Sequence, residues 1–289
     1  MQTLIKLRED LRFAGELLAM IEVLKSANAG QFRLLQARRK EAYDFRSYIE
    51  DFLGSFETTK ITHFFLTERP RLPKLILMIT SDEGFLGSLN NLVVNAGLEQ
   101  ANDDDELVVI GERGARHLSE LQTRAFTVLP GLSDDVAYAR AGAVRDLLIE
   151  KFLGKQIGSV LVAYPRFLSL TVQQVDVRKV LPCPDVFRWA PARPASAKVR
   201  PEPLTEPNKA RVIDYLVRAS LLQTLYDMFW ESKLSECAAR ILHLEGSHEE
   251  IRETNRRLSY EYFKNYHARS EKHIREIFAS RLKWSQTIS

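Results

Sequence analysis

Apolar side chains recur at a heptad spacing along the first sixty residues, and no proline interrupts them between Thr3 and Phe56. The apolar or small residues at these positions are Leu4, Leu7, Leu11, Ala14, Leu18, Ile21, Phe32, Leu35, Ala42, Ile49 and Leu53, with polar breaks at Lys25, Asn28, Arg39 and Arg46. Such a repeat is typical of a helix that pairs with another helix along an apolar seam. It predicts one helix roughly 80 Å long at 1.5 Å per residue, which is too long for an ordinary compact domain.

The other end of the chain repeats the pattern. After Pro207 there is no further proline, so a second helix is predicted from about Asn208 to Lys283. Its heptad positions carry Leu234, Cys237, Ile241, Leu244, Ile251, Leu258 and Tyr262, interrupted at His248 and Asn255. Two long terminal helices most economically pair as an antiparallel coiled coil. The alternative is that each apolar stripe packs on a globular core.

The middle of the chain shows a different pattern, in which short apolar runs alternate with segments of helical periodicity. The apolar runs are residues 75–79, 107–110, 126–129 and 160–163, and the helical segments are 86–101, 113–121 and 134–152. This alternation predicts a Rossmann-like α/β domain with a mostly parallel sheet covered by helices. Residues 170–181 resemble a further, partly exposed strand.

Prolines then divide the chain. Seven of its eleven prolines lie between Pro182 and Pro207, a composition that excludes helix and disfavours a central strand. We therefore expect four parts. They are an N-terminal coiled-coil helix at 1–60, a central α/β domain at 70–182, a Pro-rich linker at 183–207 and a C-terminal coiled-coil helix at 208–289.

Charge and cysteine content exclude several classes of protein. The 41 basic and 38 acidic residues nearly balance, so nucleic acid is not an expected partner. Cys183 and Cys237 stand far apart, outside any CxxC spacing, and support neither a disulfide framework nor a zinc site. No stretch reaches the roughly 18 apolar residues that would span a bilayer. Charged residues scattered through residues 1–24 also argue against a signal peptide.

The stretch "ITSDEGFLGSLNN" (residues 79–91) places acidic residues and glycines at the end of a predicted strand. Strand ends are where ligands bind in α/β sheets, so Asp82 could hold a metal or act as a nucleophile. The favoured interpretation is structural, with Asp82 capping the helix that follows. No GxxxxGK[ST] or GxGxxG spacing is present, and Gly111 and Gly114 in "VIGERGARHL" are interpreted as a strand-to-helix turn.

The histidines of the C-terminal helix offer a weaker candidate site. Glu245 and His248 form a single Glu-x-x-His pair, whereas a di-metal site in a helix bundle needs two such pairs and further carboxylates. Exposed or interhelical histidines are therefore favoured. Because the sequence also lacks GxSxG and HExxH, it provides no catalytic constellation, and we expect no cofactor or metal.

Two motifs resemble signatures of the gamma subunit of F-type ATP synthases. "ITSDEGFLGSLN" is similar to the family's "ITSDRGLCGGLN", and "SECAARILHLEGS" is similar to its "SEQAARMVAMENA". The first motif includes a signature turn made by Ser81, Asp82, Gly84, Gly87 and Asn90, with further matches at Ile79, Thr80 and Leu89. The second motif matches at Ser235, Glu236, Ala238, Ala239, Arg240 and Glu245. The resemblance runs over nearly the whole chain in the same order.

The chain also departs from these signatures. Glu83 stands where the family has arginine, Leu86 where it has cysteine, and Ser88 where it has a second glycine. Further on, Tyr266 and His267 stand where arginine and glutamine are expected. A divergent gamma subunit of an alternative ion-translocating ATPase would account for these departures.

The resemblance implies a mechanical part rather than an enzyme. It implies a central shaft inside a hexamer of alternating alpha and beta subunits, seated on the epsilon subunit and the membrane c ring. The shaft would couple ion-driven rotation to ATP synthesis or hydrolysis in the hexamer, at the cytoplasmic face of a bacterial inner membrane. The residues expected to contact the hexamer are Lys25, Arg33, Arg240, Glu245 and Tyr266.

Two other functions are compatible with the pattern. One is a small-molecule or nucleotide-binding α/β enzyme that uses Asp82 and Glu83, with its long helices serving dimerisation. The other is a free-standing coiled-coil adaptor. The enzyme would bind or turn over its substrate as the purified chain alone, whereas the shaft would not.

Overall fold

The computed structural model describes residues 4–53, 64–67, 69–122, 124–133, 136, 138–183, 206 and 208–287. Side chains are described for these residues except 38–53, 66, 209, 213 and 281–287. Most of the predicted Pro-rich linker thus lies outside the described residues. The chain divides into two compact units. The first unit comprises residues 1–27 and 243–289, and the second comprises residues 28–242.

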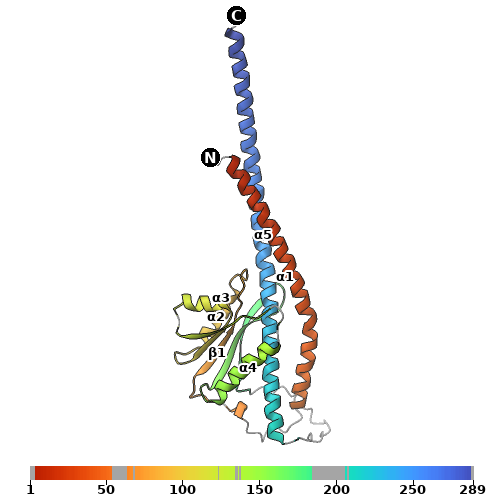
Figure 1. Cartoon of the computed structure of the whole chain (residues 1–289), viewed down its shortest axis with the longest axis vertical. Coiled ribbons are helices and arrows are strands. Elements are labelled where there is room, and N and C mark those ends of the chain that lie inside the picture. The colour runs from red at the N-terminus through yellow and green to blue at the C-terminus, as the bar shows by residue number, and fades with distance from the viewer. Residues whose placement is uncertain are drawn as a thin grey trace. The chain divides into compact units, whose positions relative to one another are not determined.

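Two long helices contribute to both units: α1 (Leu4–Leu53) and α5 (Lys209–Thr287). In the first unit they lie side by side and antiparallel (Figure 1). Lys25 Nζ of α1 lies 2.9 Å from Glu245 Oε2 of α5. The buried seam of α1 contains Leu7, Ala14 and Ile21, which are seven residues apart. This spacing brings the same face of α1 to the partner helix on every second turn. The predicted antiparallel pairing of the terminal helices is confirmed.

The second unit contains a five-stranded sheet in the order β3-β2-β1-β4-β5. Its strands are β1 (Lys74–Ile79), β2 (Glu106–Ile110), β3 (Phe126–Leu129), β4 (Ser159–Phe167) and β5 (Gln173–Leu181). The first four strands are parallel, and Leu77 of β1 lies between Val108 of β2 and Val162 of β4. Strand β5 pairs antiparallel with β4. The predicted mostly parallel sheet is confirmed.

Helices cover both faces of this sheet. They are α2 (Leu89–Glu99), α3 (Glu112–Glu120) and α4 (Tyr138–Leu153), preceded by a short 3-10 helix, η2 (Phe64–Leu66). Alternate residues of β1 point to opposite faces because the side-chain period of a strand is two. Ile76 and Met78 pack with Val93 of α2, whereas Leu77 packs in a core that includes Leu148 of α4.

Residues 221–234 of α5 belong to the same core as Leu77 and Leu148. Leu221, Leu225, Phe229 and Leu234 are buried in the same cluster as Leu77 of β1. Both arrangements considered from the sequence therefore occur, in different parts of α5. Residues 221–234 pack against the sheet in the second unit. Residues 243–287 belong to the helix pair of the first unit.

Several elements begin or end away from their predicted positions. Helix α2 begins at Leu89 rather than at residue 86, because a turn with positive φ at Phe85 and Gly87 precedes it. Helix α4 begins at Tyr138 rather than at residue 134. Strand β4 continues to Phe167, past the apolar run that ended at residue 163, because it pairs with β5 along its whole second half.

Candidate functional site

The signature turn connects the end of β1 to the start of α2, and its own side chains hold it together. The Ser81 N–H donates to Asn90 Oδ1 at 3.1 Å, and the Glu83 N–H donates to Ser81 Oγ at 3.0 Å. Gly87 has a φ of +57°, a backbone conformation that side chains disfavour. The turn therefore depends on Ser81, Gly87 and Asn90 for its backbone conformation.

The "VIGERG" stretch supports the same turn from the neighbouring strand. Gly111 has a φ of +102°, and a Cβ added there would lie 2.6 Å from the Thr80 carbonyl oxygen. A Cβ at Gly114 would overlap the Thr80 side chain. The Thr80 hydroxyl in turn donates to the Ile110 carbonyl at 2.6 Å. The two glycines thus allow close backbone packing, in agreement with the predicted strand-to-helix turn.

Asp82 caps a different helix from the one predicted. Its Oδ1 accepts a hydrogen bond of 2.8 Å from the N–H of Glu112, the first residue of α3. Helix α2, which follows Asp82 in sequence, begins after Ser88 without a side-chain capping bond. A carboxylate at a helix N-terminus satisfies a free N–H and interacts favourably with the helix dipole. The sequence could not indicate this partner because it lies 30 residues further along the chain.

The second family motif lies on α5 directly against the turn. The Ser235 hydroxyl donates to the Pro165 carbonyl of β4 at 3.1 Å. The Ser81 hydroxyl donates to Glu236 Oε2 at 3.1 Å, and Lys233 Nζ lies 3.0 Å from the same oxygen. Burial raises the pKa of the Glu236 carboxyl, and the positive charge of Lys233 opposes this shift. The two motifs, far apart in sequence, therefore meet in one buried polar network.

Arg240 extends this network by one helical turn. Its Nε donates to the Gly84 carbonyl at 3.3 Å, and its Nη1 donates to Asn28 Oδ1 at 2.9 Å. Its Nη2 forms an ion pair with Glu83 Oε2 at 2.6 Å. We call the set Ser81, Glu83, Gly84, Asn28, Lys233, Glu236 and Arg240 the signature junction. Its contacts join α1, α5 and the turn after β1.

The remaining predicted contact residues lie elsewhere. Lys25 and Glu245 pair with each other across the helix pair, and this hydrogen bond raises the pKa of Lys25 and lowers that of Glu245. Arg33 is exposed on α1, and Tyr266 is half-exposed on α5. The structure thus brings Lys25 and Glu245 together, while Arg240 belongs to the signature junction.

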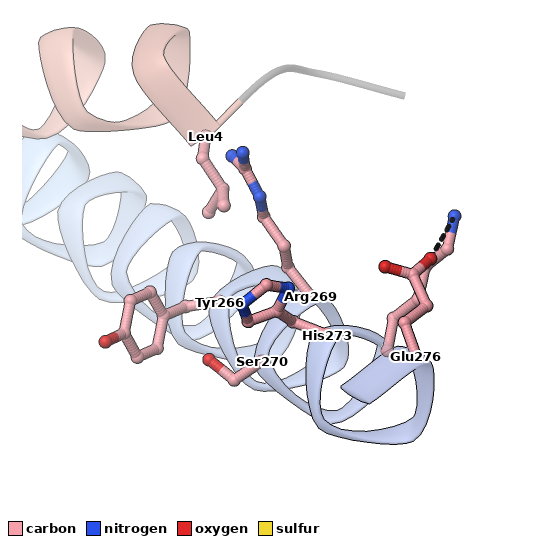
Figure 2. A pocket seen from close by; sticks show the side chains of 7 residues that line it. Leu4, Tyr266, Arg269, Ser270, His273 and Glu276 are labelled. Carbon is pink, nitrogen blue, oxygen red and sulfur yellow. Dashed lines mark ion pairs between the residues drawn. The ribbon is translucent and has the colours of Figure 1, made fainter. Parts of the chain in front are cut away.

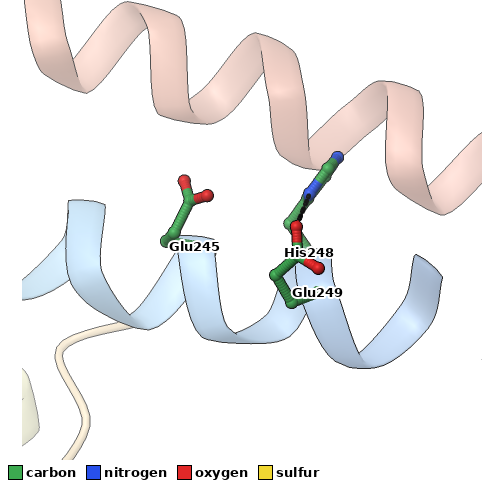
Figure 3. A group of neighbouring side chains, drawn as sticks. All are labelled: Glu245, His248 and Glu249. Atoms are coloured by element: carbon green, nitrogen blue, oxygen red, sulfur yellow. Dashed lines mark ion pairs between the residues drawn. The ribbon is translucent and has the colours of Figure 1, made fainter. Parts of the chain in front are cut away.

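A group of potential metal ligands lies on α5 next to that ion pair. Glu245, His248 and Glu249 each place one ligand atom within 4.8 Å of the others (Figure 3). His248 Nδ1 lies 3.9 Å from Glu249, and its Nε2 lies 3.9 Å from Glu22 of α1. Because the two ring nitrogens face different carboxylates, and Glu245 already pairs with Lys25, this group is an interhelical charge network.

A shallow pocket lies where α1 begins beside α5. Its volume is about 580 Å³. Figure 2 shows the side chains that line it, from Leu4 of α1 and from α5. Its lining residues are Leu4, Tyr266, Arg269, Ser270, Lys272, His273 and Glu276. Beyond it, every α5 side chain from residue 271 to residue 280 is exposed, including Ile274, Ile277 and Phe278. Residues 271–280 of α5 therefore form a surface of mixed charged and apolar character.

Together these features define the class of the protein as one in which an α/β domain is combined with a pair of long antiparallel helices. Two long terminal helices bracket an α/β domain, and the side chains that first suggested a ligand site have structural partners, one within the domain and one on α5. Asp82 is bonded to α3, and Glu83 is paired with α5. Among the described residues, no helix is both long and apolar enough to cross a lipid bilayer.

Comparison with known proteins identifies the family. A family model described as ATP synthase matches residues 4–280. The ATP synthase gamma chain of Chlorobium chlorochromatii is 23% identical over 293 residues, covering 96% of this chain and 98% of that protein. The gamma chain of Mycoplasmopsis pulmonis is 26% identical over 207 residues, covering 71% and 72%. The chain belongs to the ATP synthase gamma-chain family, the non-catalytic central-stalk subunits of F-type ATP synthases.

Solved structures share the fold. A chain of the Euglena gracilis mitochondrial ATP synthase, in a structure described as OSCP/F1/c-ring in rotational state 3, has a TM-score of 0.69 and 16% identity. That match covers 96% of this chain and 93% of the other. A chain of the Tetrahymena thermophila mitochondrial ATP synthase, described as central stalk and c ring, has a TM-score of 0.61 and 19% identity, covering 79% and 99%.

Proposed function

We propose that this chain is the rotating shaft that couples ion-driven rotation to ATP synthesis or hydrolysis in a surrounding hexamer. The observation that carries the proposal is the pair of long antiparallel helices, whose members also join the α/β domain through the buried signature junction. Two paired helices resist bending and twisting better than one. An asymmetric shaft can then favour a different conformation of each catalytic site as it turns.

The partners follow from this role. We propose alternating alpha and beta subunits around the helix pair, and the epsilon subunit and membrane c ring at the α/β domain. In support, the structural neighbours include chains described as rotor, central stalk and c ring. The complex would be peripheral to the membrane through these partners, at the cytoplasmic face of a bacterial inner membrane. The bacterial sources of the similar gamma chains support that location.

We propose that Lys25, Arg33, Arg240, Glu245 and Tyr266 contribute to the contact with the hexamer. Arg33 and Tyr266 have exposed surface for a direct contact. Lys25 and Glu245 would meet a partner as a pair, because each already neutralises the other. Arg240 would act indirectly, through the junction that buries it. The four-part division at 1–60, 70–182, 183–207 and 208–289 remains our proposal for the functional parts.

The test is to purify the tagged chain from its native membranes and identify the proteins bound to it. The shaft proposal predicts recovery with alpha, beta, epsilon and c subunits and with ATP hydrolysis. It also predicts that the purified chain alone neither binds nor hydrolyses ATP. Turnover by the chain alone would support the enzyme alternative, and recovery without alpha and beta subunits would support an adaptor.

A further inference from the structure

We propose that Arg240 is a positioning residue that pins α1 and α5 to the signature turn, and that Glu83 is an addition to this pin in the present chain. The proposal rests on the shaft function. It concerns how the torque passes between the α/β domain and the helices, which the family assignment does not specify.

The geometry uses the particular shape of arginine. A guanidinium carries five N–H donors in a rigid planar fork, so it can bond in several directions at once. Here the fork reaches Asn28 of α1, the Gly84 carbonyl and the Glu83 carboxylate, while its backbone is part of α5. A lysine at this position would offer a single charged nitrogen instead of three separated ones. The side chain is therefore suited to fix three segments in one arrangement.

Asn28 gives the pin its place on α1. It falls seven residues after Ile21 and seven before Leu35, and all three are buried. The heptad pattern indicated a polar break at Asn28, but the structure places Asn28 on the buried face of α1. A buried asparagine at a seam position costs stability and specifies how two helices align. If α1 slid along α5, the Asn28 amide and the Arg240 guanidinium would lose the hydrogen bond between them while both stayed buried.

Glu83 makes the pin different from that implied by the family signature. The signature has arginine at this position, and a second guanidinium could not form an ion pair with Arg240. The Glu83 side chain is 54% exposed, so its pair with Arg240 adds little to stability. Its contribution is directional, because it holds Nη2 of Arg240 against the turn. Turn and helix are thus joined by charge as well as by hydrogen bonds.

The pin has a mechanical consequence. Torque that enters through the α/β domain must reach both helices through their contacts with that domain. The apolar core fixes residues 221–234 of α5, whereas Arg240 also connects α1 to the turn. Loss of the fork would leave the apolar packing in place and loosen α1 against the turn. We therefore expect a softer shaft rather than an unfolded one.

The experiment uses the complete complex with Arg240→Met, Arg240→Lys, Glu83→Arg or Glu83→Gln in this chain. Glu99→Arg is the matched control, because Glu99 is an exposed acidic residue at the end of α2. Two quantities are measured on complexes that contain the variant chain in normal amount. They are the number of ions moved per ATP hydrolysed and the angular fluctuation of a probe on the α/β domain with the hexamer held fixed.

We expect the fluctuation to rise and the ion yield per ATP to fall, most in Arg240→Met, less in Glu83→Arg, and least in Glu83→Gln. Arg240→Lys should restore only part of the loss, and Glu99→Arg should match the unmodified complex. Assembled Arg240→Met and Glu83→Arg complexes with unchanged fluctuation and ion yield would overturn the pin. A complex in which the unmodified chain does not rotate would instead contradict the shaft function itself.

Discussion

The buried pair of Lys233 and Glu236 gives the sharpest prediction about stability. Both side chains are 4% exposed, with Lys233 Nζ 3.0 Å from Glu236 Oε2. Lys233→Met removes the positive charge beside the Glu236 carboxylate and keeps a long, unbranched side chain. Since the size of the side chain hardly changes, the effect on folding should report the charge rather than the packing.

The expected magnitude follows from the burial of the pair. Removing one partner of a buried ion pair typically costs about 3–5 kcal/mol, because the other charge stays in a poorly solvated site. A loss of about 3 kcal/mol lowers the folding equilibrium constant by roughly 100-fold. Replacing both partners by neutral groups is often neutral or stabilising. Lys233→Met/Glu236→Gln should therefore recover most of the stability that Lys233→Met loses.

Urea denaturation of the full chain, followed by circular dichroism, measures both variants against the unmodified protein. We expect the midpoint to fall in Lys233→Met and to return in the double variant, with the slope unchanged. Equal losses in the single and the double variant would refute the reasoning, because they would show that the charge of Glu236 is not what destabilises the single variant.

The same carboxyl makes stability depend on pH. Because burial raises the pKa of Glu236 above its ordinary value of 4.5, the unfolded chain loses this proton first as the pH rises. The contribution of Glu236 to the free energy of unfolding should then decrease from pH 4.5 up to the raised pKa of the folded state. Comparing unfolding of the unmodified chain and Lys233→Met/Glu236→Gln over this range isolates the effect, and identical pH profiles would contradict it.

Three further perturbations test separate parts of the structure. Asp82→Ala removes the cap of α3 and should cost about 0.5–2 kcal/mol of stability by urea denaturation, whereas a loss within error would contradict the capping role. Gly111→Ala should destabilise by about 1–2 kcal/mol or more, because its φ is +102° and the added Cβ would meet the Thr80 carbonyl; an unchanged midpoint would contradict this. Glu245→Gln should reduce the loss of thermal stability below pH 4.5. The pair with Lys25 lowers the pKa of Glu245, so it stabilises the folded chain above pH 4.5, and this gain is lost as the pH falls through the lowered pKa. Melting curves of both proteins across this range would show parallel pH dependence if the pair with Lys25 were irrelevant.

Sequence periodicity predicted the elements whose burial follows a simple repeat. The heptads of α1 placed Leu7, Ala14 and Ile21 on the seam, where they are buried. The apolar run at Phe126–Leu129 matches β3 residue for residue. Periodicity located the ends of elements less well, as at α2, where the turn containing Phe85 and Gly87 delays the start of the helix.

The signature junction was beyond sequence reasoning because its partners are far apart in the chain. Ser81 and Glu236 are separated by 155 residues, and Asn28 and Arg240 by 212. Arg240 was expected to contact the hexamer, whereas the structure buries its side chain in the junction. One signal was present: Ser235, Glu236 and Arg240 interrupt a stretch of α5 that is otherwise rich in buried apolar side chains. Polar residues within such a stretch need partners from another segment.

Direct observation of rotation tests the central claim most directly. A probe attached through Asp103→Cys, in the exposed turn before β2, would report the α/β domain of a complex whose hexamer is fixed to a surface. During ATP hydrolysis we predict stepwise rotation in one direction. A stationary probe on a complex that contains the chain and hydrolyses ATP would contradict the account.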